Sequence, residues 1–361
     1  MTRLLRNALL LLLSIILLLW LLAWQAGWQP QPLEEVPVSC SGPTQPLAPG
    51  QQLKVMTWNV QYLAGRRYVF WYDEARGSDT RPTDEDLAFN LDEVARVIRA
   101  EQPDIVLLQE LDKGAKASDY QDQLALLRER LADLYPCAAQ AYQWKAEFVP
   151  DRHIFGSVGR TLATLSRYTL EQAQRVQLPQ EADNVLSRLL QPQRAVLVSY
   201  LPLREGGQLA VLNTQLAKHV QGNDVQARQV RALEEQLDRF ERQGTPWLLG
   251  GDLNLLPLGQ YRRLKPQQRQ FYSPDSELHV LWDKYPMIPG NAEATGAERS
   301  AWLTHFPNDP DLEGPDRTLD YLFHSPKLRR VGAQVLQQDT LQISDHLPVT
   351  ARLLLPVPPE S

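Results

Sequence analysis

Five short polar motifs lie within or at the ends of hydrophobic runs, and they constrain the fold of this chain more than any other feature. An unpaired charge is costly to bury, so acids should occur where strands emerge at a sheet edge. Open α/β sheets place their sites at such edges. The motifs therefore predict an oxygen-rich metal centre with a histidine beside it. They occupy 57–60, 108–110, 251–254, 318–321 and 344–348.

The composition is that of an ordinary globular protein, with 43% hydrophobic and 22% charged residues. A length of 361 residues suits one large domain or two small ones. The 37 basic and 43 acidic residues give a net charge of −6. Proteins that bind duplex nucleic acid usually carry a basic surplus. The charge therefore makes a nucleic-acid substrate less expected, although a local basic groove is compatible with it.

Residues 1–28 are predicted to be a signal anchor with one transmembrane helix. The run 8–24 is apolar except for one serine, and Arg3 and Arg6 precede it. Its length is at the short limit of the roughly 17–25 residues that span a bilayer. Basic residues before the run and acidic residues after it place the N-terminus in the cytoplasm and the rest of the chain outside. A cleaved signal peptide, and hence secretion, is the alternative.

The remaining chain is divided into a linker at 29–52, a catalytic domain at 53–355 and a tail at 356–361. The linker is rich in Pro, Gln, Gly and Ser, and the tail is rich in proline. The only two cysteines are Cys40 and Cys137. An even count in an oxidising compartment suggests one disulfide, and two unpaired thiols are the alternative.

Strand and helix patterns alternate along the catalytic domain. Apolar residues at helical spacing predict helices near 87–98, 124–134 and 230–240. This alternation predicts mixed β-sheets with helices packed outside them. Strands are expected at 53–60, 105–108, 161–166, 195–201, 208–213, 247–249, 319–323, 331–336 and 347–354.

Each polar motif has a chemical and a structural interpretation. Glu110 ends a hydrophobic strand, so it either binds a divalent cation or forms a salt bridge at the rim. Asp252 and Asn254 point to the same side of an extended chain. They could orient a water and bind a phosphoryl oxygen, or simply form a turn. His346 could act as a general acid oriented by Asp320, or its motif could be a helix cap.

In combination and in this order, the motifs resemble those of the endonuclease/exonuclease/phosphatase superfamily, which includes deoxyribonuclease I. The resemblance covers 53–355. It implies an α/β fold, a four-layered α/β/β/α sandwich of two mixed sheets with the site at one end. It also implies metal-dependent hydrolysis of phosphoester bonds, most often with Mg²⁺, with Mn²⁺ or Ca²⁺ as alternatives.

The resemblance also assigns roles to individual residues. Glu110 would be the main metal ligand, with Asn59 and Asp345 close to the metal. Catalysis would rest on four residues: Asp252 would position or deprotonate the attacking water, Asn254 would stabilise the transition state, and His346, held by Asp320, would contact the phosphate.

One position departs from the family pattern. Many members have a histidine on a central strand where this chain has Gln215. Glutamine donates hydrogen bonds but does not transfer a proton at neutral pH. His153, His219 and His305 are the candidates to fill in, although we expect each on the surface or in a loop. Gln215, together with Arg160 and Arg317, is also a candidate phosphate contact.

The sequence thus favours a membrane-anchored, metal-dependent phosphoester hydrolase. Lipid or small phosphoesters are slightly favoured as substrates, because of the acidic charge, the anchor and the aromatic residues at 68–72. An extracytoplasmic endonuclease or exonuclease is the alternative, and a catalytically silent binding module is the second. The expected partners are the phosphoester substrate and the membrane, through the N-terminal helix; no protein partner is inferred.

Overall fold

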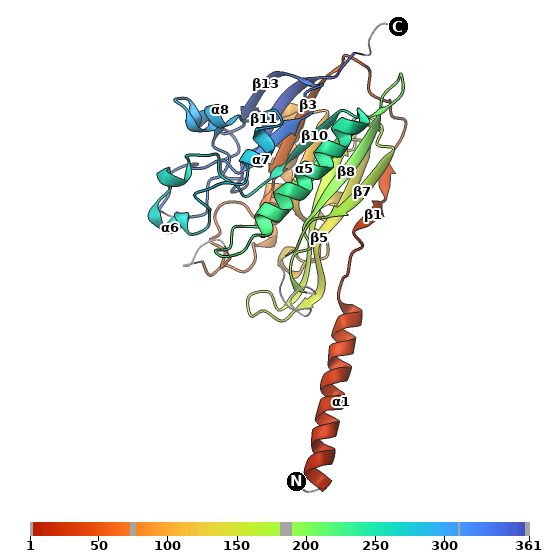
Figure 1. Cartoon of the computed structure of the whole chain (residues 1–361), viewed down its shortest axis with the longest axis vertical. Helices are drawn as coiled ribbons and strands as arrows, with labels where there is room; N and C mark the ends of the chain where they lie inside the picture. The colour runs from red at the N-terminus through yellow and green to blue at the C-terminus, as the bar shows by residue number, and fades with distance from the viewer. Residues whose placement is uncertain (1–2, 73–76, 181–189, 310, 358–361) are drawn as a thin grey trace.

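Two mixed β-sheets pack face to face in the computed structural model, which describes residues 3–72, 77–180, 190–309 and 311–357 (Figure 1). Within these residues each sheet has seven strands. The predicted sandwich of two mixed sheets with helices outside is confirmed. The ends of the predicted anchor and tail, 1–2 and 358–361, lie outside the described residues.

The first sheet has the strand order β1-β7-β8-β9-β10-β12-β11, and the second has the order β13-β14-β3-β4-β6-β5-β2. The strands of the first sheet are β1 (Leu33–Val36), β7 (Gln172–Gln177), β8 (Ala195–Pro202), β9 (Gln208–Gln215), β10 (Trp247–Asp252), β12 (Asp320–His324) and β11 (Met287–Ile288). Those of the second are β13 (Arg329–Val335), β14 (Val349–Leu354), β3 (Gln52–Asn59), β4 (Ile105–Asp112), β6 (Gly156–Ser166), β5 (Cys137–Val149) and β2 (Val38–Cys40).

One parallel pair lies near the centre of each sheet. β3 pairs in parallel with β4, and β9 with β10. Parallel neighbours end at the same edge of their sheet, and the two pairs meet at one end of the sandwich, where Asn59 of β3 donates a hydrogen bond to Asp252 of β10 at 3.2 Å. The motifs that end them are thereby brought toward one another.

Three apolar layers hold the sandwich together. Fully buried side chains such as Leu107 and Leu248 fill the space between the sheets. Helices α2 (Asp84–Glu101) and α3 (Gln123–Arg130) pack on the outer face of the second sheet. Helices α5 (Val225–Gln243) and α7 (His279–Trp282) cover the outer face of the first, and Figure 1 shows α5 lying across its strands.

The predicted helices form because one face of each is apolar. In α2 that face includes Leu87, Leu91 and Val94, all buried. The Thr83 side chain caps its start by accepting a hydrogen bond from the Asp86 amide. The other described helices are α1 (Arg3–Ala26), α6 (Pro266–Arg269), α8 (Asn291–Thr295) and the 3₁₀ turns η1 (Gln61–Leu63), η2 (Lys116–Ser118), η3 (Tyr261–Arg263) and η4 (Arg299–Trp302).

The segment 29–52, expected to be a linker, is part of the folded domain. β1 pairs antiparallel with β7 of one sheet, and β2 pairs antiparallel with β5 of the other. Sequence patterning missed both strands because they are only four and three residues long. Strands this short, set among prolines, carry too little alternation to be recognised.

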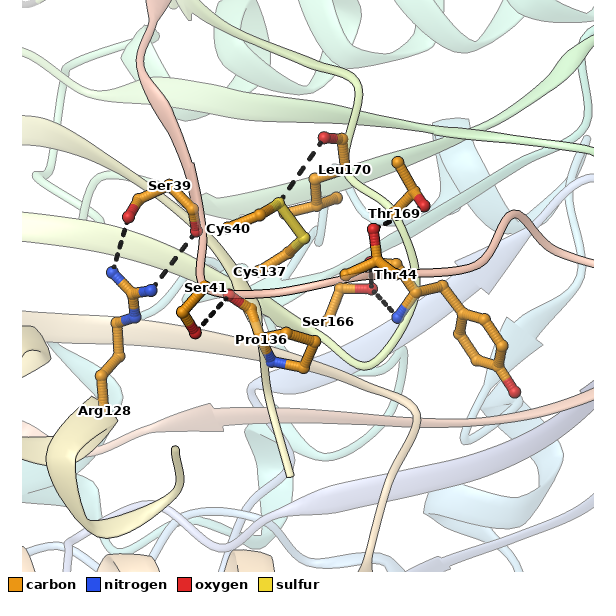
Figure 2. The surroundings of a disulfide bond; sticks show 11 residues. Ser39, Cys40, Ser41, Thr44, Arg128, Pro136, Cys137, Ser166, Thr169 and Leu170 are labelled. Carbon is orange, nitrogen blue, oxygen red and sulfur yellow. Dashed lines mark hydrogen bonds between the residues drawn. A yellow bond between two sulfur atoms is a disulfide. The ribbon is translucent and has the colours of Figure 1, made fainter. Parts of the chain in front are cut away.

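A disulfide fixes this segment to the second sheet. Cys40 of β2 and Cys137 of β5 are directly opposite one another and are bonded through sulfur (Figure 2). Arg128 of α3 donates hydrogen bonds to the Ser39 hydroxyl at 3.1 Å and the Ser39 carbonyl at 3.4 Å. The segment is therefore joined to a strand and to an outer helix.

The N-terminal helix α1 extends away from the domain (Figure 1). Its side chains at 5–18 are described, and all are exposed. Among the described residues, no helix combines the length and apolar character needed to cross a membrane. The expected transmembrane helix is thus not found in this part of the chain.

Candidate active site

The register of the first sheet places three predicted residues side by side. Asp252, the last residue of β10, pairs with Gln215 of β9 on one side and with Asp320 of β12 on the other. Gly251 permits this close approach, since a Cβ there would lie 1.9 Å from the Thr214 carbonyl oxygen. The backbone alone thus brings two acids and an amide to one edge.

Glu110 enters the same site from the second sheet through a bulge. The pairing of β4 with β6 shifts register between Gln109 and Leu111, and Glu110 has a φ of 61°. A bulge turns a side chain away from the regular alternation of the strand. Its carboxylate accepts hydrogen bonds from Gln215 Nε2 at 2.6 Å and Asn59 Nδ2 at 3.2 Å.

Arg160 of β6 balances the buried charge of Glu110. Its guanidinium lies 2.8 Å from Glu110 Oε2 and 3.1 Å from Asp112 Oδ1. Burial alone would raise the pKa of Glu110, but Arg160 and the Gln215 hydrogen bond lower it to about 2. Burial raises the pKa of Asp112, and Arg160 only partly opposes it. Glu110 is therefore ionised, and Arg160 contacts these acids rather than standing open to a phosphate.

Asp252 is surrounded by amide donors. Its Oδ2 atom accepts hydrogen bonds from Asn59 Nδ2 at 3.2 Å, Gln215 Nε2 at 3.1 Å and Asn254 Nδ2 at 3.2 Å. The Asn254 backbone amide donates to Oδ1 at 3.0 Å. The Asn254 side chain also donates to the Leu216 carbonyl at 3.0 Å. Asn254 thus orients Asp252 as well as lining the cleft.

His346 lies between two acids. Its Nδ1 atom is 2.8 Å from Asp320 Oδ2, and its Nε2 atom is 3.8 Å from Asp252 Oδ2. Burial would lower the pKa of His346, but Asp320, Asp252 and Asp345 raise it well above its usual value. Burial raises the pKa of Asp320 to about 6, against the opposing charge of His346. At neutral pH the pair is an imidazolium held by a carboxylate.

His305, expected on the surface or in a loop, lies inside the site. Its ring centroid is 4.4 Å from that of His346, and its Nε2 atom is 3.7 Å from Asp345 Oδ2. Isolated β-bridges connect His305 to Arg317 and His346. Burial, followed by the charge of His346, lowers the pKa of His305 well below its usual value. It is therefore a neutral imidazole beside a charged one.

The other two histidines lie elsewhere. His153 stacks against Trp71 with ring centroids 4.4 Å apart, outside the cleft that holds His346. His219 is half-buried in the segment after β9. Neither lines the cleft that contains Glu110 and His346, so neither takes the place of the family histidine.

Like Arg160, the other two predicted phosphate contacts are already engaged by protein groups. Arg317 is 1% exposed, and its guanidinium pairs with Asp316 at 2.6 Å. It also donates to Gln268 at 3.0 Å and Tyr272 at 3.2 Å. The Gln215 oxygen accepts hydrogen bonds from Gln143 and Arg194, each at 2.7 Å.

Sequence reasoning missed several residues that line the same cleft. Lys218 lies three residues after Gln215, and Tyr72 comes from the loop after β3. Gln61 and Asn308 are buried, and their side-chain amide atoms have no protein partner in the described structure. Gln61 begins a turn in which it and the next two residues have positive φ. A polar residue directly after the Asn59 motif was the one available signal for it.

The donor set fits a hard divalent cation. Glu110, Asp252 and Asp345 open onto one cleft, and carboxylate oxygens are the preferred ligands of Mg²⁺, Mn²⁺ and Ca²⁺. Asn59 lies beside these acids, with its amide nitrogen facing Glu110 and Asp252 and its oxygen accepting a hydrogen bond from the Gln61 backbone amide at 3.0 Å. Buried Asp320 Oδ1 has no protein hydrogen-bond partner. Two further groups have ligand atoms within 4.8 Å of one another: Asp252 with Asp320 and His346, and His305 with Asp345 and His346.

Comparison with known proteins gives a consistent result. The sequence model of the Endonuclease/Exonuclease/phosphatase family matches residues 56–346, which include all the predicted catalytic and metal-binding residues from Asn59 to His346. No curated protein sequence matches the chain.

Several solved structures share the fold. An endonuclease/exonuclease/phosphatase from Beutenbergia cavernae is 23% identical, with a TM-score of 0.56 over 84% of this chain and 72% of that one. The human Nocturnin catalytic domain with bound sulfate anion is 17% identical, with a TM-score of 0.52 over 88% and 96%. TDP2 from Caenorhabditis elegans is 17% identical, with a TM-score of 0.51 over 85% and 76%.

Proposed function

The chain belongs to the endonuclease/exonuclease/phosphatase family and is a metal-dependent hydrolase of phosphoester bonds, and we propose that it acts on small or lipid phosphoesters outside the cytoplasm. The observation that supports the catalytic assignment is the position of His346 between two acids. Its Nδ1 atom lies 2.8 Å from the Asp320 carboxylate, and its Nε2 atom lies 3.8 Å from the Asp252 carboxylate. Glu110 faces the same cleft.

In this proposal Asp252 orients the attacking water and accepts its proton. Three amide donors fix its carboxylate, so little reorganisation is needed when charge develops. Protonated His346 binds a phosphoryl oxygen, because its Nδ1 is occupied by Asp320 and its Nε2 faces the cleft side of Asp252. Water and phosphate are thus held for in-line attack, where positioning supplies much of the rate.

Glu110 would hold the divalent cation, with Asn59 and Asp345 nearby; when bound, Mg²⁺ would neutralise charge on the phosphoryl oxygens. Because Asn254 donates to both Asp252 and the Leu216 carbonyl, its proposed contact with the transition state requires its amide to exchange one of these partners. Its positioning of Asp252 requires no such exchange.

Gln215 occupies the place of the central-strand histidine and cannot supply a proton. Its amide instead donates to Glu110 and Asp252. We propose that this enzyme favours esters whose leaving group departs without strong acid assistance. His346 is the one cationic imidazole at the cleft among the described residues.

Nucleic acid is the second candidate substrate. Lys218 lines the cleft, and Arg81 and Lys116 line the adjoining pocket. These cations favour a polyanion, while the net charge of −6 opposes it. A nuclease would lose activity steeply as salt rises, whereas a small-ester hydrolase would not.

We also propose that residues 1–28 anchor the chain, with the N-terminus cytoplasmic and the catalytic domain extracytoplasmic. The apolar run at 8–24 supports this, and a disulfide between Cys40 and Cys137 suits an oxidising compartment. Retention in the membrane fraction after alkaline washing, with protease cleavage from outside, is expected. Release of the intact catalytic domain into the medium would instead identify a cleaved signal.

The deciding experiment uses the full-length protein in detergent with Mg²⁺. Substrates are plasmid DNA, RNA, sphingomyelin and other phospholipids, and a soluble phosphodiester. Glu110→Ala, His346→Ala and a chelator should each abolish turnover, while Glu129→Ala on an exposed face of α3 should not. Activity that survives Glu110→Ala would overturn the metal assignment. Turnover of DNA or RNA alone would replace the proposed substrate class with the nuclease.

A further inference from the structure

A second pocket adjoins the catalytic cleft, and its walls combine aromatic rings with charged and small side chains. Tyr62, Trp71, Trp144 and His153 line it. Tyr72 lines both the pocket and the cleft. Arg160 also lines the pocket, and its guanidinium is the group that pairs with Glu110 in the cleft at 2.8 Å. We call this hollow the aromatic pocket; a group bound in it would lie next to a phosphate held at Glu110 and His346.

The rings of the aromatic pocket are held in place by contacts with one another and with neighbouring groups. Trp71 stacks on His153 with centroids 4.4 Å apart and planes 15° apart. The Tyr62 and Tyr72 hydroxyls share a hydrogen bond, and Arg160 lies 4.4 Å from the centre of the Tyr62 ring. The Trp144 indole donates to the Leu190 carbonyl at 2.9 Å. The walls therefore exist before a ligand arrives, which reduces the entropy lost on binding.

The residues that line the aromatic pocket suit a planar heterocycle better than a fatty-acyl chain. A fatty-acyl chain needs a channel of aliphatic side chains, and beyond alanines the pocket offers only Ile154 and Val158 among its described lining. A planar heterocycle needs flat faces for stacking and polar groups at its edge. Thr80 and Ser157 provide hydroxyls, and Arg81 provides a cation at the same pocket.

We propose that the aromatic pocket binds the nucleobase of a nucleoside phosphoester whose phosphate is hydrolysed in the catalytic cleft. The inference rests on the proposed function for the phosphate and adds the identity of the group attached to it. Trp71 and His153 form one wall, and Tyr72 separates the base from the phosphate. This occupant is a small ester with a single base, so it does not require the long basic groove of a nuclease.

Two matched substrates test the proposal on the full-length protein with Mg²⁺. One is the trifluoroethyl ester of adenosine 5′-monophosphate, and the other is the trifluoroethyl ester of ribose 5-phosphate, which lacks the base; this leaving group needs little acid assistance and has no ring of its own. We expect the wild-type kcat/KM to favour the base-bearing ester by about fivefold or more, the lower end of what one stacked base contributes. Trp71→Ala should bring this ratio close to one, mainly through KM, and Trp71→Phe should restore most of it.

A variant outside the pocket provides the control. Phe148 is 49% exposed and does not line the aromatic pocket, so Phe148→Ala should keep the wild-type ratio. Equal kcat/KM for both esters in an active wild-type enzyme would overturn the base assignment and leave the hydrolase intact. Hydrolysis of phospholipid vesicles that is lost in Trp71→Ala, without base discrimination, would replace the base by a lipid chain.

A binding measurement without turnover separates the hypothesis of a base-binding pocket from the hypothesis of phosphoester hydrolysis. Adenosine 5′-monophosphate and ribose 5-phosphate are titrated into the protein in chelator, and the heat of binding is measured. Tighter binding of the nucleotide that is lost in Trp71→Ala, from a protein that hydrolyses neither ester, would support the pocket and contradict the proposed function. Equal or absent binding of the two ligands would overturn the pocket assignment.

Discussion

Nδ1 of His346 lies 2.8 Å from the Asp320 carboxylate, although the two residues come from different segments of the chain. This contact keeps the imidazole protonated and aims its other nitrogen at the Asp252 side of the cleft.

Asp320→Asn should lower activity and move its alkaline limit. His346 must be protonated in the proposed reaction, so activity should fall as pH rises through its pKa, which is raised well above the usual value. Of the groups that raise the pKa of His346 against the effect of burial, Asp320 has the largest influence. Without its charge the pKa should fall, so the loss of activity at alkaline pH should begin at a lower pH. We expect kcat to fall by about a hundredfold, the lower end for loss of one positioned donor to the transition state. An unchanged pH profile of kcat would contradict the assignment.

Because Gln215 does not donate a proton, the rate of hydrolysis should depend strongly on how easily the leaving group departs. Without a proton donor there, a p-nitrophenyl ester should be cleaved much faster than the matching methyl ester. Gln215→His should narrow this difference, because imidazole transfers a proton near neutral pH and glutamine does not. The ratio of kcat for the two esters measures the effect. Equal rates in the wild-type enzyme would show that another group protonates the leaving oxygen.

Because Glu110 forms an ion pair, the free energy of unfolding of the metal-free protein should decrease as the pH becomes acidic. The pKa of Glu110 is lowered from 4.5 to about 2. A carboxyl group whose pKa is lower in the folded protein stabilises it at pH values above the pKa of the unfolded state. This contribution is lost as the pH falls through the pKa of the folded state. About 3 kcal/mol should therefore disappear between pH 4.5 and 2. Urea unfolding in chelator should show a weaker pH dependence over this range in Glu110→Gln, whereas Glu129→Gln should resemble the wild type.

Loss of the disulfide should destabilise the domain without removing a catalytic group. Cys40 and Cys137 are 97 residues apart in sequence, and closing such a loop restricts the unfolded chain. Replacing both with alanine should reduce the free energy of unfolding by about 2–5 kcal/mol. Urea titration measures this, with Glu129→Ala on the exposed face of α3 as the control. A double variant with the wild-type midpoint would show that β2 pairing alone secures the segment.

The sequence was informative wherever a motif lay at one end of a strand. Asp252 and Asp320 meet through the antiparallel register of β10 and β12, and Asn59 at the end of β3 reaches Asp252 from the other sheet. His305 could not be located in this way, because it reaches the site through isolated bridges to Arg317 and His346. The pairing of Arg160 with Glu110 depends on the bulge between β4 and β6, which no local pattern encodes.

The same limit applies to aromatic residues. The cluster at 68–72 was visible in the sequence, but its stacking partner His153 lies in the β5–β6 connection. Which ring faces which is decided by contacts between distant loops. Sequence patterning therefore identified the catalytic end of the sandwich more fully than the pocket beside it.

The two short strands between 29 and 52 set a practical boundary for preparing the domain. Each covers an otherwise unpaired edge, β1 along β7 and β2 along β5. A fragment that starts at the first long strand, near 53, would leave hydrogen-bonding groups on both edges open to other chains. Such a fragment should self-associate, whereas one that begins before Leu33 retains its own edge protection.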